Sequence, residues 1–316
     1  MDQNVPENVA AQLPALKALG NRIVNARTGE PVRLRGVNWS GFEYNRESRM
    51  GEAALDRIAG WGANLVRLPF NAAWAIGSEA YRCALDEAIA GAAERKMYTL
   101  LDLQWLDAQT VRGHLKDGRE NFVPALPDRT AMVVWDLLAR RYRTNPAVLY
   151  DIFNEPHDPL PDDYTFPLQR RRVDAGVWHE WASDLIRAIR AAHADALIFV
   201  SGLDWGYDLS SFPIAGIEDV VYSTHVYPHK TKNWERAFGK LSRTHPVFAA
   251  ELGGENEHLD WGHQLMDYLD ALEIGWAAWS WCDHPHLIAP GTEDEPTAFG
   301  ALVRSRMDSP DSKRSV

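Results

Sequence analysis

The sequence predicts an α/β protein folded as a (β/α)8 TIM barrel in a single domain. Short apolar runs rich in β-branched residues alternate with amphipathic helical stretches over nearly the whole chain, which is typical of parallel strands joined by crossover helices. The chain has 316 residues, an ordinary length for one such barrel, and contains no linker-like or low-complexity segment. We therefore expect one domain over residues 1–316.

Eight strands are expected, and the intervals between them leave room for helices. The strand-like runs are Val32–Val37, Asn64–Leu68, Tyr98–Leu103, Val148–Phe153, Leu197–Ser201, Val220–His225, Val247–Glu251 and Trp276–Trp281. Apolar residues repeat at helical spacing between these runs, for example at Leu85, Ile89 and Ala92. A last helix over Thr297–Met307 completes the eighth unit.

Several segments fall outside this alternation. Asn21–Pro31, ahead of the first strand, predicts a small hairpin that plugs the N-terminal end of the barrel. Asp308–Val316 is polar and predicts a flexible tail. The longest segments without a helix or strand pattern are Asp107–Thr130 and His157–Asp174, which follow the third and fourth strands, at the end of a barrel where active sites are built.

Composition excludes several classes of function. The net charge of -11 and the pI of about 5.5 leave no basic face for a nucleic acid. There is no run of eighteen apolar residues that would span a membrane, and Cys83 and Cys282 lack metal-type spacing. We expect no metal and no cofactor. The N-terminus, Met1–Pro6, has neither the basic start nor the apolar middle of a signal peptide.

Two glutamates end strands on opposite sides of the expected barrel. The fourth strand runs into Asn154-Glu155-Pro156, and the seventh runs into Glu251-Leu252-Gly253. Because the carboxyl ends of parallel strands meet at one rim, we expect the two carboxyl groups to face each other there. Either glutamate alone is equally explained as a polar residue bounding a strand. Together they match glycosidic cleavage, which needs one protonated and one ionised carboxyl group.

At this point the chain resembles glycoside hydrolase family 5 and its clan A of cellulase-like barrels, over roughly Ile23–Met307. The matching motifs are Leu34-Arg35-Gly36-Val37-Asn38, Asn64-Leu65-Val66-Arg67-Leu68-Pro69, Asn154-Glu155-Pro156, Ser223-Thr224-His225-Val226-Tyr227 and Ala278-Trp279-Ser280-Trp281, in the family's order. The resemblance implies a retaining β-glycoside hydrolase with Glu155 as acid/base and Glu251 as nucleophile.

The resemblance also implies roles for the neighbouring polar residues. Arg67 would hydrogen-bond the nucleophile and help to keep it ionised. Asn154 would bind the 2-hydroxyl of the substrate. Tyr227 would donate to the nucleophile, His225 would lie near the acid/base pair, and Asn38, which ends the first strand, is expected in the same site.

Aromatic residues at strand ends are candidates for sugar contact. By resemblance, Trp279 would be the floor on which the sugar before the scissile bond stacks. Trp39, Trp105, Trp205 and Trp281 also lie at or just past strand ends, where aromatic faces can meet pyranose rings. For these four residues a place in the core is an equally good interpretation.

One position departs from the family. Members usually have Asp-x-His at the end of the third strand, whereas this chain has Asp102-Leu103-Gln104. Gln104 can donate and accept a hydrogen bond but cannot titrate. We expect it to bind substrate, with a shift in sugar preference or pH dependence.

The leading expectation for the substrate is a β-1,4-linked glucan cut internally by double displacement. The alternatives are a β-mannanase, an exo-acting β-glucosidase, a non-catalytic carbohydrate-binding barrel and a barrel enzyme of unrelated chemistry. Because a polymer cannot enter a cell, we expect a secreted or periplasmic protein, with a cytoplasmic one left open by the missing signal. The oligomeric state is not predicted.

Overall fold

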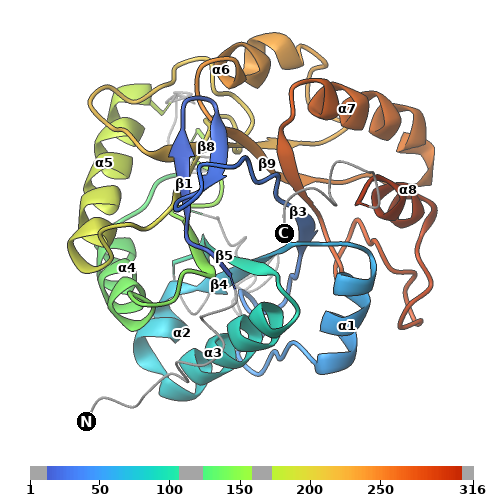
Figure 1. The fold of residues 1–316 in the computed structure, drawn as a ribbon, viewed down its shortest axis with the longest axis horizontal. Helices are drawn as coiled ribbons and strands as arrows, with labels where there is room; N and C mark the ends of the chain where they lie inside the picture. The colour runs from blue at the N-terminus through green and yellow to red at the C-terminus, as the bar shows by residue number, and fades with distance from the viewer. Residues whose placement is uncertain (1–12, 107–123, 159–172, 308–316) are drawn as a thin grey trace, which may run out of the picture.

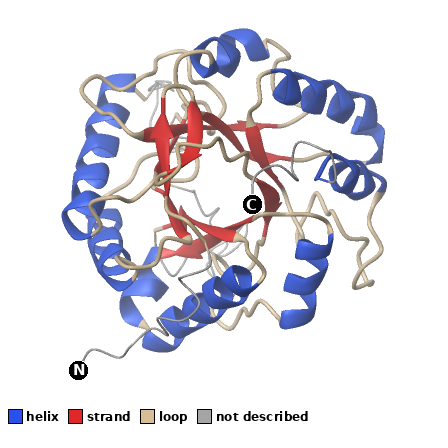
Figure 2. Cartoon of the chain, viewed as in Figure 1, coloured by secondary structure: helices blue, strands red, loops and turns tan. Residues whose placement is uncertain are grey.

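The computed structural model describes residues 13–106, 124–158 and 173–307. Within these ranges eight parallel strands close into a barrel, in the order β10-β3-β4-β5-β6-β7-β8-β9, as predicted. They are β3 (Arg35–Asn38), β4 (Leu65–Asn71), β5 (Tyr98–Trp105), β6 (Val148–Asp151), β7 (Ile198–Ser201), β8 (Val220–Val226), β9 (Val247–Leu252) and β10 (Gly275–Ala278). Figure 2 shows the ring of strands inside a ring of helices.

The helices lie around the outside of the barrel (Figure 1). They are α1 (Glu52–Gly60), α2 (Ala72–Gly77), α3 (Glu79–Glu94), α4 (Arg129–Arg141), α5 (Ala175–Ala192), α6 (Lys240–Ser242), α7 (Leu259–Ala271) and α8 (Ala298–Met307), with a π-helical turn at Glu235–Gly239 and a 3-10 turn at Asn256–His258. The side chains of Ser78, Asp128 and Asp174 cap α3, α4 and α5 by accepting backbone N–H groups. None of the helices in the described ranges is long and apolar enough to cross a membrane.

The predicted strands are all present, but several of their ends differ. Val32 does not begin the first barrel strand, because its N–H donates to Ile23 O and ties it to the preceding hairpin. The fourth and eighth strands end early, so that Glu155 and Trp279 lie in the loops that follow β6 and β10. Apolar character alone does not show where ladder pairing stops.

The N-terminal plug is a hairpin of β1 (Leu16–Leu19) and β2 (Arg22–Asn25), which Figure 1 shows across one end of the barrel. Its first strand lies ahead of the predicted segment, because Gly20, at a φ of +60°, makes the turn that pairs Leu19 with Arg22. Apolar side chains of the hairpin pack against the inward-facing side chains at the N-terminal ends of the barrel strands. The hairpin therefore closes that end.

Inward-facing positions change from apolar to polar along the strands. The apolar ones include Leu65, Leu100, Leu149, Phe199 and Phe248, and the polar ones, two residues further on in four of these strands, are Arg67, Asp102, Asp151 and Ser201. Alternate residues of a strand share a face, so the polar group forms a layer above the apolar one, toward the C-terminal mouth. The interior thus has a sealed floor and a polar upper layer.

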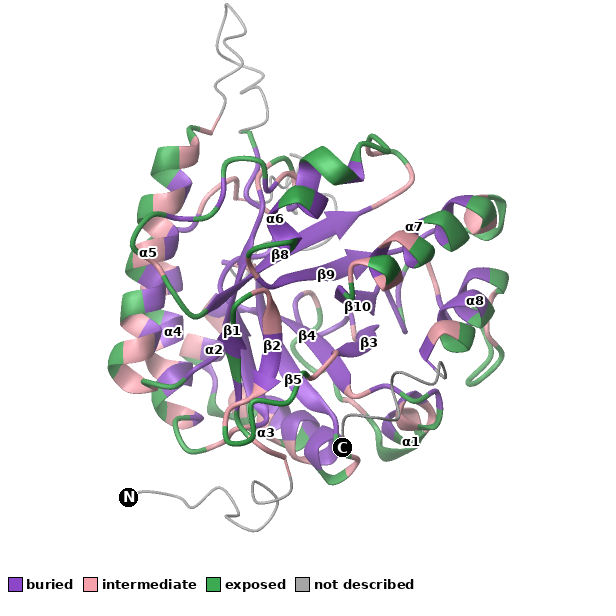
Figure 3. Cartoon of the chain, turned by 45° about the horizontal axis from the view of Figure 1, so that its top comes forward, coloured by how far each residue is buried: buried purple, intermediate pink, exposed green. Residues whose placement is uncertain are grey.

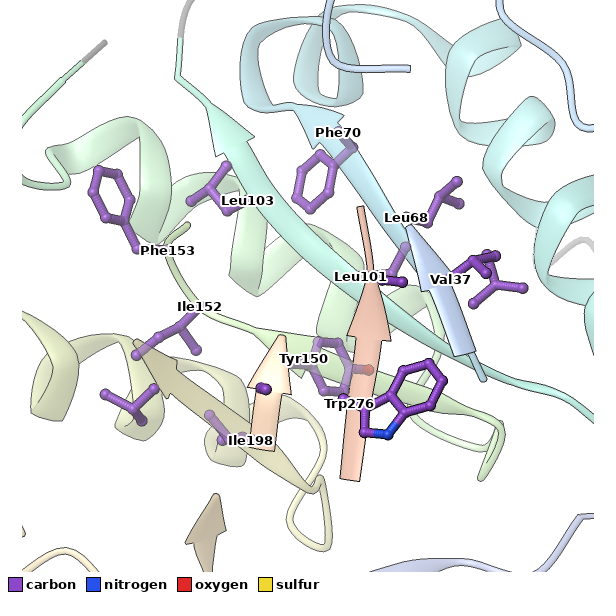
Figure 4. Packing of buried hydrophobic residues seen from close by; sticks show 14 of the residues in the cluster. Val37, Leu68, Phe70, Leu101, Leu103, Tyr150, Ile152, Phe153, Ile198 and Trp276 are labelled. Atoms are coloured by element: carbon purple, nitrogen blue, oxygen red, sulfur yellow. The ribbon is translucent and has the colours of Figure 1, made fainter. Parts of the chain in front are cut away.

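Outward-facing strand residues form the main core with the helices. Phe70 on β4 meets Trp135 of α4, and Phe153 meets Trp178 of α5. Figure 4 shows part of this cluster, and Figure 3 shows barrel strands that are buried over most of their length while most helices keep an exposed outer face. These two layers hold the strand ends, and hence the site, in fixed positions.

One connection breaks the βα alternation. Residues 202–219, between β7 and β8, form a turn with two antiparallel bridges and no helix. Asp204, Trp205 and Gly206 all have positive φ, which a right-handed helix does not accommodate. The predicted tail 308–316 lies outside the described residues, as do 107–123 and 159–172 of the two long predicted loops.

Candidate active site

Arg67 lies at the centre of the polar layer and is fully buried. Its Nε donates to Asp151 Oδ2 (3.0 Å), its Nη1 to Glu251 Oε1 (2.8 Å) and Asn38 Oδ1 (2.9 Å), and its Nη2 to Asn154 Oδ1 (2.8 Å), while Asp102 Oδ1 lies 3.0 Å from Nη2. A guanidinium has five N–H donors in a rigid fork, so one side chain orients five residues, which come from β3, β5, β6, β9 and the loop after β6.

Glu251 lies within β9, where the ladder is irregular on both sides. Ala250 is the extra residue opposite the step from Thr224 to His225, and a second register shift faces β10. Such bulges re-aim side chains. Glu251 Oε1 accepts from Arg67, and Oε2 accepts from the Tyr227 hydroxyl at 2.7 Å. Burial raises the pKa of Tyr227 well above its usual range, so this hydroxyl stays a donor.

Glu155 follows β6 in the loop and is partly exposed, with its side chain at the mouth of the barrel. Desolvation raises its pKa to about 7, against a lowering influence of the Arg67 charge. Its Oε1 lies 3.0 Å from Nδ1 of His225, whose own pKa burial lowers to about 4, so this imidazole is neutral near pH 7. One carboxyl group is therefore held protonated near neutrality beside a neutral partner.

Glu155, Glu251 and His225 come together at one point. One ligand atom from each lies within 4.8 Å of the other two, close enough to share a cation. It is the one such group in the described part of the chain. Both oxygens of Glu251 are already engaged by Arg67 and Tyr227, so the arrangement fits a pair of reacting carboxyl groups better than a metal centre.

The helix-free turn after β7 seats the imidazole of His225. The His225 N–H donates to Gly206 O (3.1 Å), and a Cβ on Gly206 would lie 2.7 Å from the His225 ring. Lys230 Nζ donates to Asp204 O (2.7 Å) and fixes the turn from outside. Glycine is needed at 206 for this close approach as well as for its φ of +73°.

Trp205 lies at the same turn, on the Glu155 side. Its N–H donates to Pro156 O (3.1 Å), and its ring stacks on the His157 imidazole with centroids 3.5 Å apart. A non-glycine residue with a φ of +59° is uncommon and is found preferentially at functional sites. One face of the indole is thus covered by protein.

The other candidate aromatics divide between the mouth and the core. Trp279 follows β10, is partly exposed and donates from Nε1 to His284 O (3.1 Å). Trp105 ends β5 and meets the ring of Tyr44. Trp39 is partly buried against the main core, while Trp281 is buried against Trp61 with centroids 4.8 Å apart. Of these tryptophans, Trp281 is the one that lies in the core and not at the mouth.

Gln104 lies at a bulge near the end of β5. Leu103 pairs with Phe70 and Trp105 with Asn71, so Gln104 is the extra residue. Its Oε1 is buried and accepts no hydrogen bond. An acceptor left without a partner at the mouth of a barrel is a place for a donor supplied by a ligand.

The structure brings Arg67, Asn154, Glu155, His225, Tyr227 and Glu251 into one connected group. Asn38 belongs to its support: fully buried, it donates to Ala250 O and Ala277 O and accepts from Arg67. No role was predicted for Asp102 and Asp151, which complete the surroundings of Arg67. The available signal was a carboxylate inside an apolar strand run, at positions that face the barrel interior.

A family model for cellulases, glycosyl hydrolase family 5, matches residues 26–285. Endoglucanase MaCel5A of Microbulbifer sp. (strain ALW1) is 24% identical over 291 residues, which cover 85% of this chain and 51% of that protein. An endoglucanase of Paenibacillus polymyxa is 26% identical over 326 residues, with 83% and 78% covered. This chain thus spans about half the length of the first relative and more of the second.

Solved structures have the same fold at low identity. The β-glucanase SdGluc5_26A from Saccharophagus degradans, in complex with cellotetraose, superposes with a TM-score of 0.78 at 22% identity and covers 97% of this chain and 96% of its own. The catalytic domain of Thermobifida fusca endoglucanase Cel5A (E5) gives 0.74 at 20% identity, with 95% and 99% covered.

Proposed function

Because the chain belongs to glycosyl hydrolase family 5, we propose that it is a retaining β-glycoside hydrolase that cuts β-1,4-linked glucan internally. The observation that carries the mechanism is the separation of Glu155 and Glu251, of which one oxygen each lies within 4.8 Å. Retaining enzymes hold their carboxyl groups about 5–5.5 Å apart, whereas inverting enzymes need roughly 6.5–9.5 Å for a water molecule.

In the first step, the Glu251 carboxylate attacks the anomeric carbon while the bond from that carbon to the leaving oxygen breaks. Glu155 gives its proton to the leaving oxygen, and a glycosyl ester of Glu251 remains. In the second step, Glu155, now ionised, takes a proton from water as that water attacks the anomeric carbon. The ester bond breaks, Glu251 returns as a carboxylate, and the sugar keeps its configuration.

The neighbouring residues assist this chemistry through position and charge. Arg67 and Tyr227 fix both oxygens of Glu251 and so aim its attack. The neutral imidazole of His225 holds Glu155 in place without adding charge. Asn154 Nδ2 is left to reach the 2-hydroxyl, since its Oδ1 accepts from Arg67.

We propose glucan as the substrate because the relatives are named endoglucanases and one matching structure holds cellotetraose. A β-mannan, or a β-glucoside trimmed from one end, is served by the same carboxyl pair and is an alternative. We propose that the enzyme is secreted or periplasmic, since a polymeric substrate cannot enter the cell.

A panel of polysaccharides and aryl β-glycosides, with products sized, tests the proposal. Release of oligomers from carboxymethylcellulose by wild type, and none by Glu155→Ala, supports an internally cutting glucanase. Faster release from mannan, or monosaccharide alone from short substrates, supports the alternative specificities. Absence of hydrolysis across the panel would point instead to a carbohydrate-binding barrel.

The pH dependence of hydrolysis should follow the ionisation of Glu155. Its raised pKa of about 7 keeps the acid form, which the first step consumes, present below that pH. We expect kcat/KM to fall with rising pH through about 7 and then by at least about tenfold per pH unit, since only the enzyme with protonated Glu155 reacts. A pH profile of kcat/KM on a soluble glucan measures this. Full activity two units above would show that Glu155 is not the acid.

Glu155→Gln supplies the matching variant for that profile. An aryl glycoside with a strongly acidic phenol as leaving group needs little protonation, so its cleavage should be affected much less than that of glucan. The variant's remaining activity should lose the part of the alkaline decline that the ionisation of Glu155 causes. Equal losses on both substrates would contradict an acid role.

Gln104 is expected to accept a hydrogen bond from a hydroxyl of the reacting sugar. Its buried Oε1 has no partner in the free protein, so Gln104→Ala removes a contact made only to substrate. One neutral hydrogen bond contributes about 1 kcal/mol, which corresponds to roughly a fivefold loss of kcat/KM. Gln264→Ala, on the exposed face of α7, is the control. An unchanged kcat/KM in Gln104→Ala would exclude the contact.

A further inference from the structure

Three buried carboxyl groups, including that of the nucleophile, surround the guanidinium of Arg67. Asp102 and Asp151 are fully buried, the side chain of Glu251 is 5% exposed, and each has an oxygen within 3.0 Å of the Arg67 guanidinium. If all three were ionised, the group would carry two uncompensated negative charges in the barrel interior. Unpaired charge in such a place is strongly unfavourable, so a bound proton is the expected remedy.

The three carboxyl groups differ in hydrogen bonding. Glu251 accepts from Arg67 and Tyr227, and Asp151 accepts from Arg67 Nε. Neither oxygen of Asp102 accepts a hydrogen bond of good geometry, even though one lies 3.0 Å from Arg67 Nη2. Hydrogen bonds to a carboxylate stabilise its charged form, so Asp102 is the least stabilised as an anion.

The charges facing Asp102 also favour its neutral form. Asp102 is paired with Asp151 in the ladder between β5 and β6. Glu251 of β9 and Glu43, in the loop after β3, add further negative charge, against the single cation of Arg67 on β4. Burial, followed by these neighbours, raises the pKa of Asp102 well above its usual range, while burial raises that of Asp151 to about 6.

We propose that Asp102 is a positioning residue that carries a proton in the resting enzyme, so that only Asp151 and Glu251 share the charge of Arg67. The proton leaves Arg67 free to hold the nucleophile with its full charge. Once it is lost, a third anion at 3.0 Å competes for the guanidinium and loosens the hold on Glu251. The protonation itself does not depend on the proposed reaction; only its kinetic consequence does.

Aspartate-selective ¹³C labelling of the side-chain carboxyl carbon tests the protonation directly. Glutamates stay unlabelled, so Glu155 and Glu251 are silent. At about pH 7, which is far above the ordinary pKa range of aspartate, we expect one aspartate signal at the chemical shift of a protonated carboxyl group. This signal should be absent in Asp102→Asn. Asp260→Asn, on the exposed side of α7, is the matched control and should leave that signal in place.

Two further outcomes decide the case if Asp102→Asn does not fold. The wild-type spectrum alone must contain the protonated signal, and Asp151→Asn should move its titration to lower pH by removing a neighbouring anion. A wild-type spectrum in which no aspartate carboxyl group remains protonated at about pH 7 overturns the proposal.

The pH profile gives the kinetic readout. In wild type, the loss of kcat/KM above pH 7 should become steeper than one proton predicts, because Asp102 and Glu155 both ionise. In Asp102→Asn, whose amide cannot ionise, the decline should follow one proton. Equal slopes, with the protonated signal present, would show a proton without kinetic effect and refute the positioning role. Absence of all hydrolysis would refute the proposed function and leave the spectroscopic result standing.

Discussion

Glu251→Gln is expected to lower kcat on β-1,4-glucan by at least about 10⁴-fold while the protein stays folded, because an amide cannot form the glycosyl ester and nucleophile losses are of this order. The fold should survive because Asp151 still compensates the buried charge of Arg67. Initial rates on a soluble glucan and circular dichroism of both proteins measure the two parts of this result.

Glu257→Gln is the matched control for the nucleophile variant, since Glu257 lies exposed six residues further along the chain. It should hydrolyse glucan at the wild-type rate. Mass spectrometry of a slowly turned-over glycoside on wild type should locate one added sugar on the peptide that contains Glu251. A Glu251→Gln enzyme within tenfold of wild type, or a sugar found on another peptide, would remove Glu251 from its role.

Arg67→Lys should reduce both stability and activity, although it keeps the charge. A lysine ammonium has three donors at one point, whereas Arg67 reaches three carboxyl groups and two amides in different directions. Breaking a buried ion-pair network costs about 3–5 kcal/mol of the free energy of unfolding. Loss of the grip on Glu251 should lower kcat by roughly a hundredfold, since misplacing a reacting group by about 1 Å has that effect.

Urea unfolding and glucan kinetics on the same preparation test Arg67→Lys. Arg143→Lys, at an exposed position past the end of α4, is the control and should change neither measurement. If Arg67→Lys unfolds at the wild-type urea concentration, the polar layer is not held by the guanidinium, and the role of Asp102 would need another basis.

Much of this architecture was predictable because it depends on local patterns. Each barrel strand is an apolar run between polar segments, and the shared rim of parallel strands brings Glu155 and Glu251 together without further information. The ends of strands were less predictable. Trp279 belongs to an apolar run that continues past the last ladder pair, and whether pairing continues depends on the neighbouring strand.

The residues that support the site could not be predicted from the sequence, for a related reason. In the sequence, nothing distinguishes Asp102 and Asp151 from other aspartates. Both contact Arg67 only because β4, β5 and β6 lie side by side. Gly206 likewise looks like any turn glycine until His225 is seen to fill the space of its missing side chain. Contacts of this kind depend on three-dimensional placement, which local patterns do not contain.

Because the hairpin closes the N-terminal end, the barrel interior opens to solvent only at its C-terminal mouth. Leu16 and Ala18 pack onto the apolar floor, so in the part of the chain that the structure describes this end is filled by side chains. The water that completes each turnover must therefore arrive through the mouth, by the route that the departing chain has just vacated. Any hydroxylated molecule waiting there competes with water for the bound sugar. High concentrations of short glucans should then be lengthened as well as cut.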